Sequence, residues 1–391
     1  MFTGLAPYQH GAHRTKGRSG AARHRSGGTK IPRENSLPYD GRHSTLAEAL
    51  GQAGYTTAAY CANDGYLSRR WGLARGFQKY VAKRVPARTL TARALAWIGR
   101  QASDVPYFLF LNYMDTHREY STVPPRPDIV GYAVEVRSTP NLLALRRAVF
   151  PGIDPAPPEL VQKLVDQYDT ALANLDAGLD PLLRHLERER DRSVVVITSD
   201  HGEYLGEHLW AEHPRDVYQE GIRVPLIVAL PTQRSGRVDD TVVASQHLPN
   251  RILRALGKPA AAMLPKFSAT PHNTPAISEN YFDRARFLRN PRWGHRFQRI
   301  RRAFFKWPYK LIHSSDGKHE LYDLRRDPRE ESNLWSKRNS RGKRMLSELE
   351  RRMGAALRAP PPPPPPPPAA VELSVEDRRR LEELGYLETG S

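Results

Sequence analysis

The segment Ser193-Val-Val-Val-Ile-Thr-Ser-Asp-His-Gly-Glu203 decides how the rest of the sequence is read. Its run of β-branched residues has no helical period, which predicts a strand buried on both faces. Asp200 and His201 follow the strand, and Gly202 then lets the backbone turn sharply. Because ligands of open α/β sheets bind beyond the carboxyl ends of the strands, this pair is predicted to offer a carboxylate and an imidazole to one metal ion. The alternative is a solvated turn in which the pair has no function.

The residues after this segment continue in an order that resembles the sulfatase family of the alkaline-phosphatase superfamily. Leu205-Gly-Glu-His208 precedes His213, and Tyr218-Gln-Glu-Gly-Ile-Arg-Val-Pro-Leu-Ile-Val228 follows. Members of that family typically read SDHGE-x-LG-(D/E)-H, then a Lys or His, then a YxE-x-x-RVPLIV-like strand. The resemblance implies an alkaline-phosphatase-like α/β fold. In this fold a mixed, mainly parallel sheet is flanked by helices, with a small C-terminal antiparallel subdomain.

Length and composition set the limits of this interpretation. A chain of 391 residues can hold one large α/β domain and a smaller one. With 34 prolines and 39% apolar residues, part of the chain is expected to be loop or tail. No apolar run reaches the length of a transmembrane helix. The start of the sequence lacks the order of a signal peptide, and the compartment stays open. Cys61 is the only cysteine, so no intrachain disulfide is possible.

The formal net charge of +18 comes mainly from arginine. Arginines cluster at 14–33, 284–302 and 338–352, but without the interleaved aromatic residues and glycines of a known nucleic-acid module. No specific nucleic-acid partner is therefore expected. The charge is explained either by solvated arginine-rich faces or by a field that attracts anionic sulfate or phosphate esters. The oligomeric state cannot be inferred from the sequence.

The first residues match the family downstream of its nucleophile. Residues 2–14 resemble a TG-x-x-P-x-x-HG segment, which in relatives directly follows the motif Cys (or Ser)-x-Pro-Ser/Ala-Arg that yields formylglycine. That motif, and a first strand carrying one or two Asp metal ligands, lie upstream in relatives. The chain is therefore expected to be a truncated member that is inactive by itself. It is also expected to be poorly soluble, since that strand lies inside the sheet of relatives.

Helices are predicted at 45–54, at 90–102 and at 158–190, the first with Ser44 or Thr45 as its N-cap. Buried strands are predicted at 55–62 and at 106–112, which places Cys61 in the core. A strand-plus-helix unit is predicted at 242–256, and a hairpin at Asp316-Gly317.

Two histidines match positions that contact the substrate in relatives. The segment 106–117 resembles FLFLHYMDPH, whose last residue contacts the ester sulfate, so the resemblance implies this role for His117. His213 falls where relatives place a sulfate-contacting Lys or His. A structural role is the alternative for each. The strand predicted at 55–62 is followed by Asn63-Asp64-Gly65. Arylsulfatases carry G-K-W-H at this point, so the Lys and His of that motif are absent here. Asp115 is expected to form a turn rather than to bind metal.

The resemblance implies hydrolysis of sulfate monoesters, of the arylsulfatase type, through a hydrated formylglycine and a divalent ion. Asp200 and His201 are the metal ligands that the chain itself supplies. Ca²⁺ is preferred, although His201 stands where relatives that bind Ca²⁺ usually carry Asn, which favours Mn²⁺ or Zn²⁺. The alternatives are a phosphatase or phosphonate-monoester hydrolase of the same superfamily, or a non-catalytic remnant that binds anions.

The predicted domain organisation has a partial catalytic core at 1–265 and a C-terminal subdomain at 266–345. A linker at 346–372 contains the proline run at 360–368, which favours an extended spacer. A capped helical tail is predicted at 373–391.

Overall fold

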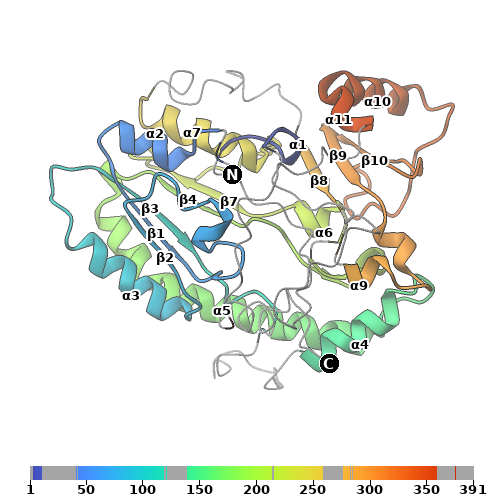
Figure 1. Cartoon of the computed structure of the whole chain (residues 1–391), viewed down its shortest axis with the longest axis horizontal. Coiled ribbons are helices and arrows are strands. Elements are labelled where there is room, and N and C mark those ends of the chain that lie inside the picture. Colours follow the sequence, from blue (N-terminus) through green and yellow to red (C-terminus); the bar gives the residue numbers. More distant parts are fainter. Residues whose placement is uncertain are drawn as a thin grey trace.

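The computed structural model describes residues 3–10, 41, 43–118, 120, 139–213, 215–258, 276–281, 283, 285–358 and 375. These residues form an α/β part and a smaller C-terminal part that lie side by side (Figure 1). The predicted proline run at 360–368 lies outside the described residues, as does the predicted tail helix at 373–391 apart from Val375.

A parallel sheet forms the centre of the α/β part. Its strand order is β2 (Lys79–Ala82), β1 (Thr56–Cys61), β3 (Tyr107–Asn112), and β1 pairs in parallel with both neighbours. Since parallel strands share one orientation, the segments that follow them emerge at the same edge of the sheet. The strands predicted at 55–62 and 106–112 both form, and Cys61 is buried as expected. The first is buried as predicted, whereas all six residues of β3 are only partly buried.

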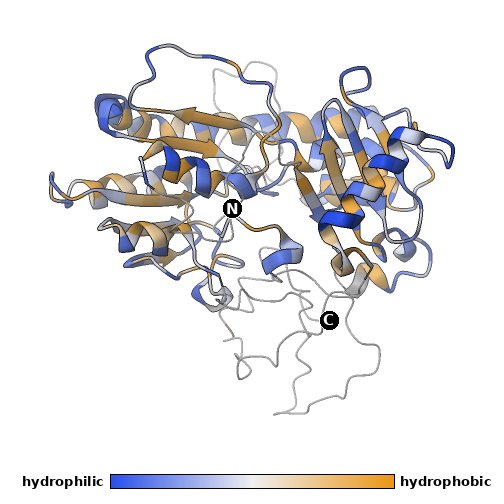
Figure 2. Cartoon of the chain, turned by 90° about the horizontal axis from the view of Figure 1, so that it is seen from above, coloured by the Kyte–Doolittle hydropathy of each residue, from blue (hydrophilic) through white to orange (hydrophobic). Residues whose placement is uncertain are grey.

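Helices cover both faces of this sheet. On one face lie α3 (Ala87–Ile98) and α5 (Pro158–Arg188), on the other α2 (Leu46–Gln52) and α7 (Leu248–Ala255). Figure 2 shows the strands as hydrophobic ribbons between these helices. The first face is closed by a cluster that includes Ala58, Tyr60, Leu90, Trp97 and Leu182. Burial on both faces explains why these strands show no alternation of polar and apolar residues.

Local hydrogen bonds set the helix boundaries. A capping box starts α2, because the Thr45 hydroxyl accepts from the Glu48 amide at 3.1 Å and the Glu48 carboxylate accepts from the Thr45 amide at 2.9 Å. The helix predicted at 90–102 instead spans Ala87–Ile98. It begins earlier because Asp115 accepts a hydrogen bond from the Ala87 amide at 3.0 Å. It ends earlier, with Gly99 at its C-cap, where the Gly99 amide donates to the Leu95 carbonyl at 2.9 Å.

The strand of the opening segment, which was predicted to be buried on both faces, is partly exposed. β4 (Val195–Thr198) pairs antiparallel with β7 (Leu226–Ala229), and among the described residues these two strands pair only with each other. All four residues of β4 are only partly buried, and Ile227 on β7 is 59% exposed. The prediction of burial on both faces is therefore wrong for the described residues. The reason is that β4 lacks a second neighbouring strand within them, so its apolar side chains are covered incompletely.

A small hairpin and a short helix follow β4. β5 (Tyr204–Leu205) pairs antiparallel with β6 (Ala211–Glu212), and η3 (Glu207–Leu209) joins them. The next element, α6 (Gln219–Ile222), lies directly before β7.

The C-terminal part is a four-stranded antiparallel sheet in the order β11-β10-β9-β8. Its strands are β8 (Ile277–Asn280), β9 (Arg301–Lys306), β10 (Tyr309–Ser314) and β11 (Glu320–Asp323). The predicted hairpin joins β10 to β11, and Gly317 in it adopts φ +81°, which glycine tolerates. The helix α10 (Ser340–Met353) packs on this sheet through Met345, Leu349 and Met353.

The strand predicted near 242 does not form. Residues 242–244 have no ladder partner; Val242 and Ala244 instead pack their side chains against the central core, and η4 and α7 follow. The remaining elements are α1 (Pro7–His10), η1 (Arg69–Trp71), α4 (Thr139–Val149), η2 (Arg190–Arg192), η4 (Ser245–His247), α9 (Ala285–Leu288), η5 (Gly294–Phe297) and α11 (Ala355–Arg358).

The arrangement is the alkaline-phosphatase-like α/β fold that the sequence predicted, with a parallel sheet flanked by helices and a C-terminal antiparallel sheet. Among the described residues, no helix has the length and apolar character that a bilayer span needs.

Candidate active site

The loop after β4 is fixed against α6 by a close backbone approach. The Gly202 amide donates to the Gly221 carbonyl at 2.9 Å. A Cβ atom on Gly202 would lie 2.0 Å from the Glu220 carbonyl oxygen, so only glycine fits at this position. The loop therefore presents the residues on either side of Gly202 in a defined direction.

Asp200 and His201 direct unshared electron pairs toward a common region. His201 Nδ1 lies 2.9 Å from the Gly202 carbonyl, which can only accept, so Nδ1 carries the proton. In the neutral ring the free lone pair is then on Nε2, 3.7 Å from Asp200 Oδ2. The Asp200 side chain is 69% exposed and that of His201 36%. A carboxylate oxygen and an imidazole nitrogen placed in this way fit a divalent cation between them.

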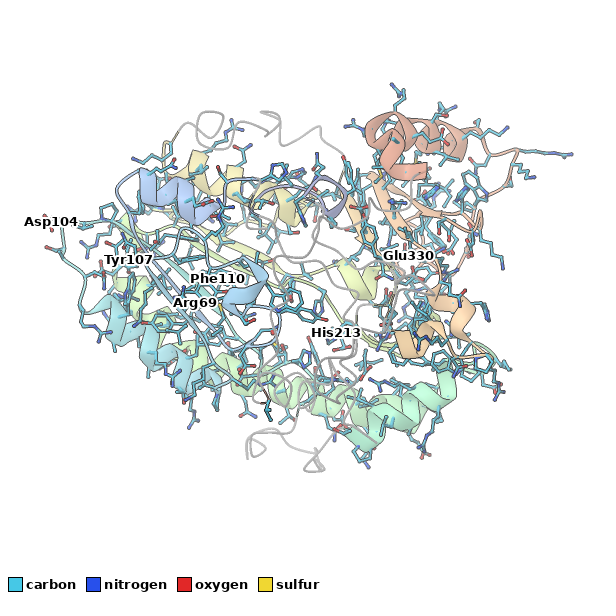
Figure 3. The ribbon with its side chains drawn as sticks, in the orientation of Figure 1. Arg69, Asp104, Tyr107, Phe110, His213 and Glu330 are labelled. Carbon is cyan, nitrogen blue, oxygen red and sulfur yellow. The ribbon has the colours of Figure 1, made fainter. Side chains whose placement is uncertain are left out.

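Three histidine rings form a continuous group beside this pair. The His201 and His213 rings stack with centroids 4.2 Å apart, and the His117 ring meets His213 edge-on at 4.9 Å. Figure 3 shows His213 between the parallel sheet and the C-terminal part. The structure thus brings the four residues predicted from the sequence into one neighbourhood: His117, Asp200, His201 and His213.

A buried carboxylate lies behind His213. Glu203 Oε2 and Oε1 are 2.9 and 3.1 Å from His213 Nδ1, and both side chains are 8% exposed. Burial, together with the charge of Glu212, raises the pKa of Glu203 to about 8. Burial, with the nearby His201, holds the pKa of His213 well below its usual value. The contact with Glu203 orients the ring and leaves Nε2 directed away from the carboxylate.

His117 follows β3 and is 9% exposed. Its pKa is held well below the usual value, first by burial and then by the charges of His213, Arg118 and Arg84. A neutral imidazole offers one N–H donor and one lone pair.

An open groove of about 1520 Å³ borders this group. Asp200, His201 and His213 line it, together with arginines that include Arg223 and Arg251. His117 is not among the lining residues and reaches the group through its contact with His213.

Asp115, for which the sequence predicted a structural role, has one, and so does Asn63. Asn63 accepts from the Tyr66 amide at 2.9 Å within its loop, and Asp115 holds the start of α3. Glu203 was missed as a site residue, although it is the last residue of the opening segment. A glutamate in an otherwise apolar or glycine-rich turn is the signal that could have indicated its burial.

One other group within the described residues has the composition of a metal site: His208, Glu220 and Glu330. His208 Nε2 lies 3.4 Å from Glu220 Oε2. The Lys310 ammonium, fully buried, lies 2.7 Å from Glu330 Oε1. Because this ammonium already supplies a positive charge, the group is explained as a partly buried ion-pair network without a metal.

Comparison with known proteins gives a consistent picture. Residues 1–258 match the family model described as Sulfatase, and residues 206–358 match the model described as N-sulphoglucosamine sulphohydrolase, C-terminal. An N-acetylglucosamine-6-O-sulfatase of Bacteroides thetaiotaomicron is 29% identical over 188 residues, which are 45% of this chain and 32% of that protein. Iduronate 2-sulfatase of Mus musculus is 26% identical over 190 residues, 42% of this chain and 33% of that protein. The chain spans about a third of the length of the curated relatives it matches.

Solved structures share the fold. A 2-O GAG sulfatase superposes with a TM-score of 0.60 at 16% identity, covering 91% of this chain and 80% of that chain. The phosphonate monoester hydrolase of Agrobacterium radiobacter superposes with a TM-score of 0.57 at 18% identity, covering 82% and 81%.

Proposed function

The chain belongs to the sulfatase family, and from that premise we propose that it carries part of the active site of a hydrolase of sulfate monoesters. The observation that carries the proposal is the group formed by the Asp200 carboxylate, the His201 lone pair and the stacked His213 ring. Carboxylate and imidazole groups directed at one point are what a metal-assisted ester hydrolysis requires.

We propose Asp200 and His201 as the ligands that this chain gives to a divalent metal. Bound there, the ion would act as a Lewis acid toward an ester oxygen. Ca²⁺ fits the Asp200 oxygen, while Mn²⁺ or Zn²⁺ fits the His201 nitrogen better. Both side chains are accessible from the groove, so a cation can enter without opening the core.

His213 and His117 are assigned to the anionic part of the substrate. Both rings are neutral near pH 7, because burial keeps their pKa values low. A neutral ring can donate one hydrogen bond to a sulfate oxygen. Glu203, whose pKa is raised to about 8, donates to His213 Nδ1 in its protonated form, and the single ring proton then lies on Nε2 as the donor to the sulfate. His117 lies one ring further from the metal ligands.

We further propose that residues 1–391 alone do not turn over a sulfate ester. These residues contain no Cys (or Ser)-x-Pro-Ser/Ala-Arg segment, and only Asp200 and His201 are assigned to the metal. Two ligands hold a hard cation weakly. Binding, rather than turnover, is therefore the property by which this chain can be tested.

A phosphate or phosphonate monoester is the second candidate substrate. The observation that favours it is His201, whose nitrogen suits the softer metals. A third possibility is a non-catalytic protein that binds anions at the arginine-lined groove.

The test is a titration of the 391-residue chain with inorganic sulfate and with inorganic phosphate, each in the presence of Mn²⁺. We expect His213→Ala to weaken sulfate binding about tenfold or more, the loss expected for one hydrogen bond to a charged group. His295→Ala is the matched control, since His295 is an exposed histidine of the C-terminal part. Preference for phosphate would favour the second candidate. Equal effects of both variants would contradict the assignment of the site.

A further inference from the structure

A buried carboxylate, that of Glu212, joins the chain segments that carry His117 and His213. Glu212 is 2% exposed and interacts with three arginines. Its Oε1 lies 3.2 Å from Arg118 Nη1, and its Oε2 lies 2.7 Å from Arg215 Nη2. Arg146 donates to Oε2 from Nε at 2.8 Å and also from Nη2. The arginines keep the pKa of this carboxyl low despite its burial, so Glu212 is ionised at neutral pH.

Two residues of this cluster are sequence neighbours of histidines of the candidate site. Glu212 directly precedes His213, and Arg118 directly follows His117. Glu212 adopts φ +61°, a left-handed conformation that is uncommon for a residue with a side chain. This conformation turns the chain between the end of β6 and His213. The Glu212–Arg118 ion pair therefore bridges the two segments one residue away from the contact between the two rings.

We infer that Glu212 is a positioning residue whose ion pair with Arg118 holds His117 against His213. The inference rests on the function proposed above for these histidines. Glu203 orients the His213 ring from behind. The Glu212–Arg118 pair acts differently, because it fixes the separation of the two backbone segments and so the 4.9 Å edge contact between the rings.

Electrostatics explains why a charged residue is required here. Arg118, Arg146 and Arg215 converge on one carboxylate, and Asp283 accepts from Arg215 Nη1 at 2.5 Å. Without the Glu212 charge, buried guanidinium groups would face one another and repel. Arg118 and Arg146 are the less buried of the three, with 16% and 14% of their side chains exposed, whereas Arg215 is 3% exposed and is also paired with Asp283. Loss of the Glu212 charge therefore favours movement of Arg118 toward solvent. His117 would then move with it, away from His213.

A purely stabilising role is the rival explanation, and a matched variant separates the two. Glu279 on β8 is another fully buried carboxylate that accepts from an arginine, at 3.1 Å from Arg302 Nε. Glu279→Gln removes the same charge from the same kind of pair, in the C-terminal sheet.

The experiment is a nuclear Overhauser measurement between the His117 and His213 ring protons in the full 391-residue chain. We expect the cross-peak in the unaltered protein, its loss in Glu212→Gln and in Arg118→Gln, and its retention in Glu279→Gln. Arg118→Gln decides the question if Glu212→Gln does not fold. Retention of the cross-peak in Arg118→Gln, or its loss in a folded Glu279→Gln, overturns the inference.

A sulfate titration of the same variants keeps this inference apart from the proposed function. If the histidines bind the anion, Arg118→Gln weakens inorganic sulfate binding about tenfold, as for one misplaced hydrogen bond to a charged group. If the unaltered chain binds no sulfate, the proposed function fails. The ring cross-peak still decides whether Glu212 positions His117.

Discussion

The C-terminal sheet and the loop after β4 both gather charged or polar side chains, and they differ in how those groups are paired. In the sheet, Arg301 is 1% exposed and donates to Asp216 at 2.9 Å and to Glu320 at 2.6 Å. In the loop, the Asp200 side chain is 69% exposed, and its Oδ2 lies 3.7 Å from Nε2 of the His201 ring. The charged groups of the sheet are paired with one another within the protein, whereas the Asp200 carboxylate of the loop is accessible to a ligand.

The difference shows which charges serve the fold and which serve binding. A buried charge must be paired, because an unpaired one costs several kcal/mol. An exposed carboxylate carries no such requirement, so its position beside the His201 lone pair adds nothing to stability. Substitutions in the two regions are therefore predicted to affect different properties.

The largest effect is expected from breaking the buried network. Arg301→Leu leaves Asp216, whose side chain is 0% exposed, without its closest charged partner. We expect the free energy of unfolding to fall by about 3–5 kcal/mol, measured by urea denaturation. Asp200→Asn, in the exposed loop, is expected to change it by no more than about 0.5 kcal/mol. Similar losses in the two variants would remove the distinction between the regions.

The second effect is on the pH dependence of the free energy of unfolding. The loop after β4 is predicted to change it near neutral pH, and the network of the C-terminal sheet at acidic pH. The pKa of Glu203 is raised to about 8 by burial and by the charge of Glu212. The folded protein then keeps a proton that the unfolded chain releases above its ordinary pKa, so Glu203 lowers stability as pH rises toward 8. His213, whose pKa is lowered, has the opposite influence, but only below its ordinary pKa of about 6.5.

Between pH 6.5 and 8, Glu203 acts without the opposing influence of His213. His208, whose pKa is raised by Glu220 against the effect of burial, lowers stability in the same direction. We expect the free energy of unfolding to fall by about 1–2 kcal/mol across this window, and Glu203→Gln to reduce that slope. In the C-terminal part, Arg301 and Arg299 lower the pKa of Asp216 against the effect of burial. Its stabilisation is present above about pH 3.9 and is lost on further acidification. A flat profile from pH 6.5 to 8 in the unaltered protein would show that Glu203 is not held protonated.

The smallest effect on stability is expected at the exposed strand pair. Ile227→Thr on β7, where the side chain is 59% exposed, is predicted to change the free energy of unfolding by no more than about 0.5 kcal/mol. It should nevertheless raise the soluble fraction of the expressed chain, because exposed apolar strands promote aggregation. Ile312→Thr on the buried β10 is the control and should cost about 2 kcal/mol or more. Unchanged solubility in Ile227→Thr would indicate that β4 and β7 are covered in solution.

The sequence predicted the fold well where the signal was local. The capping box of Thr45 and Glu48, the turn at Gly317 and the strands ending at Cys61 and Asn112 all depend on residues close together in the chain. The burial of β4 was predicted wrongly because it depends on neighbouring strands, which a run of valines does not reveal.

The same limit applies to the site. The motif residues were found from their order, but their partners come from distant segments. Arg118 lies 94 positions before Glu212, and no local pattern indicates that they meet. The role of Glu203 likewise becomes visible only when His213, ten positions later, folds back onto it.

The central claim is that a divalent metal binds at Asp200 and His201, and paramagnetic broadening of histidine ring signals by Mn²⁺ tests it most directly. We expect weak binding, with a Kd of about 1 mM. His201 should broaden first, His213 and His117 next, and Asp200→Asn should abolish the effect. Asp191→Asn, with a carboxylate that is 71% exposed, is the matched control and should not alter it. Broadening of His208 before His201 would contradict the account, because it would place the ion at Glu220 and Glu330 instead.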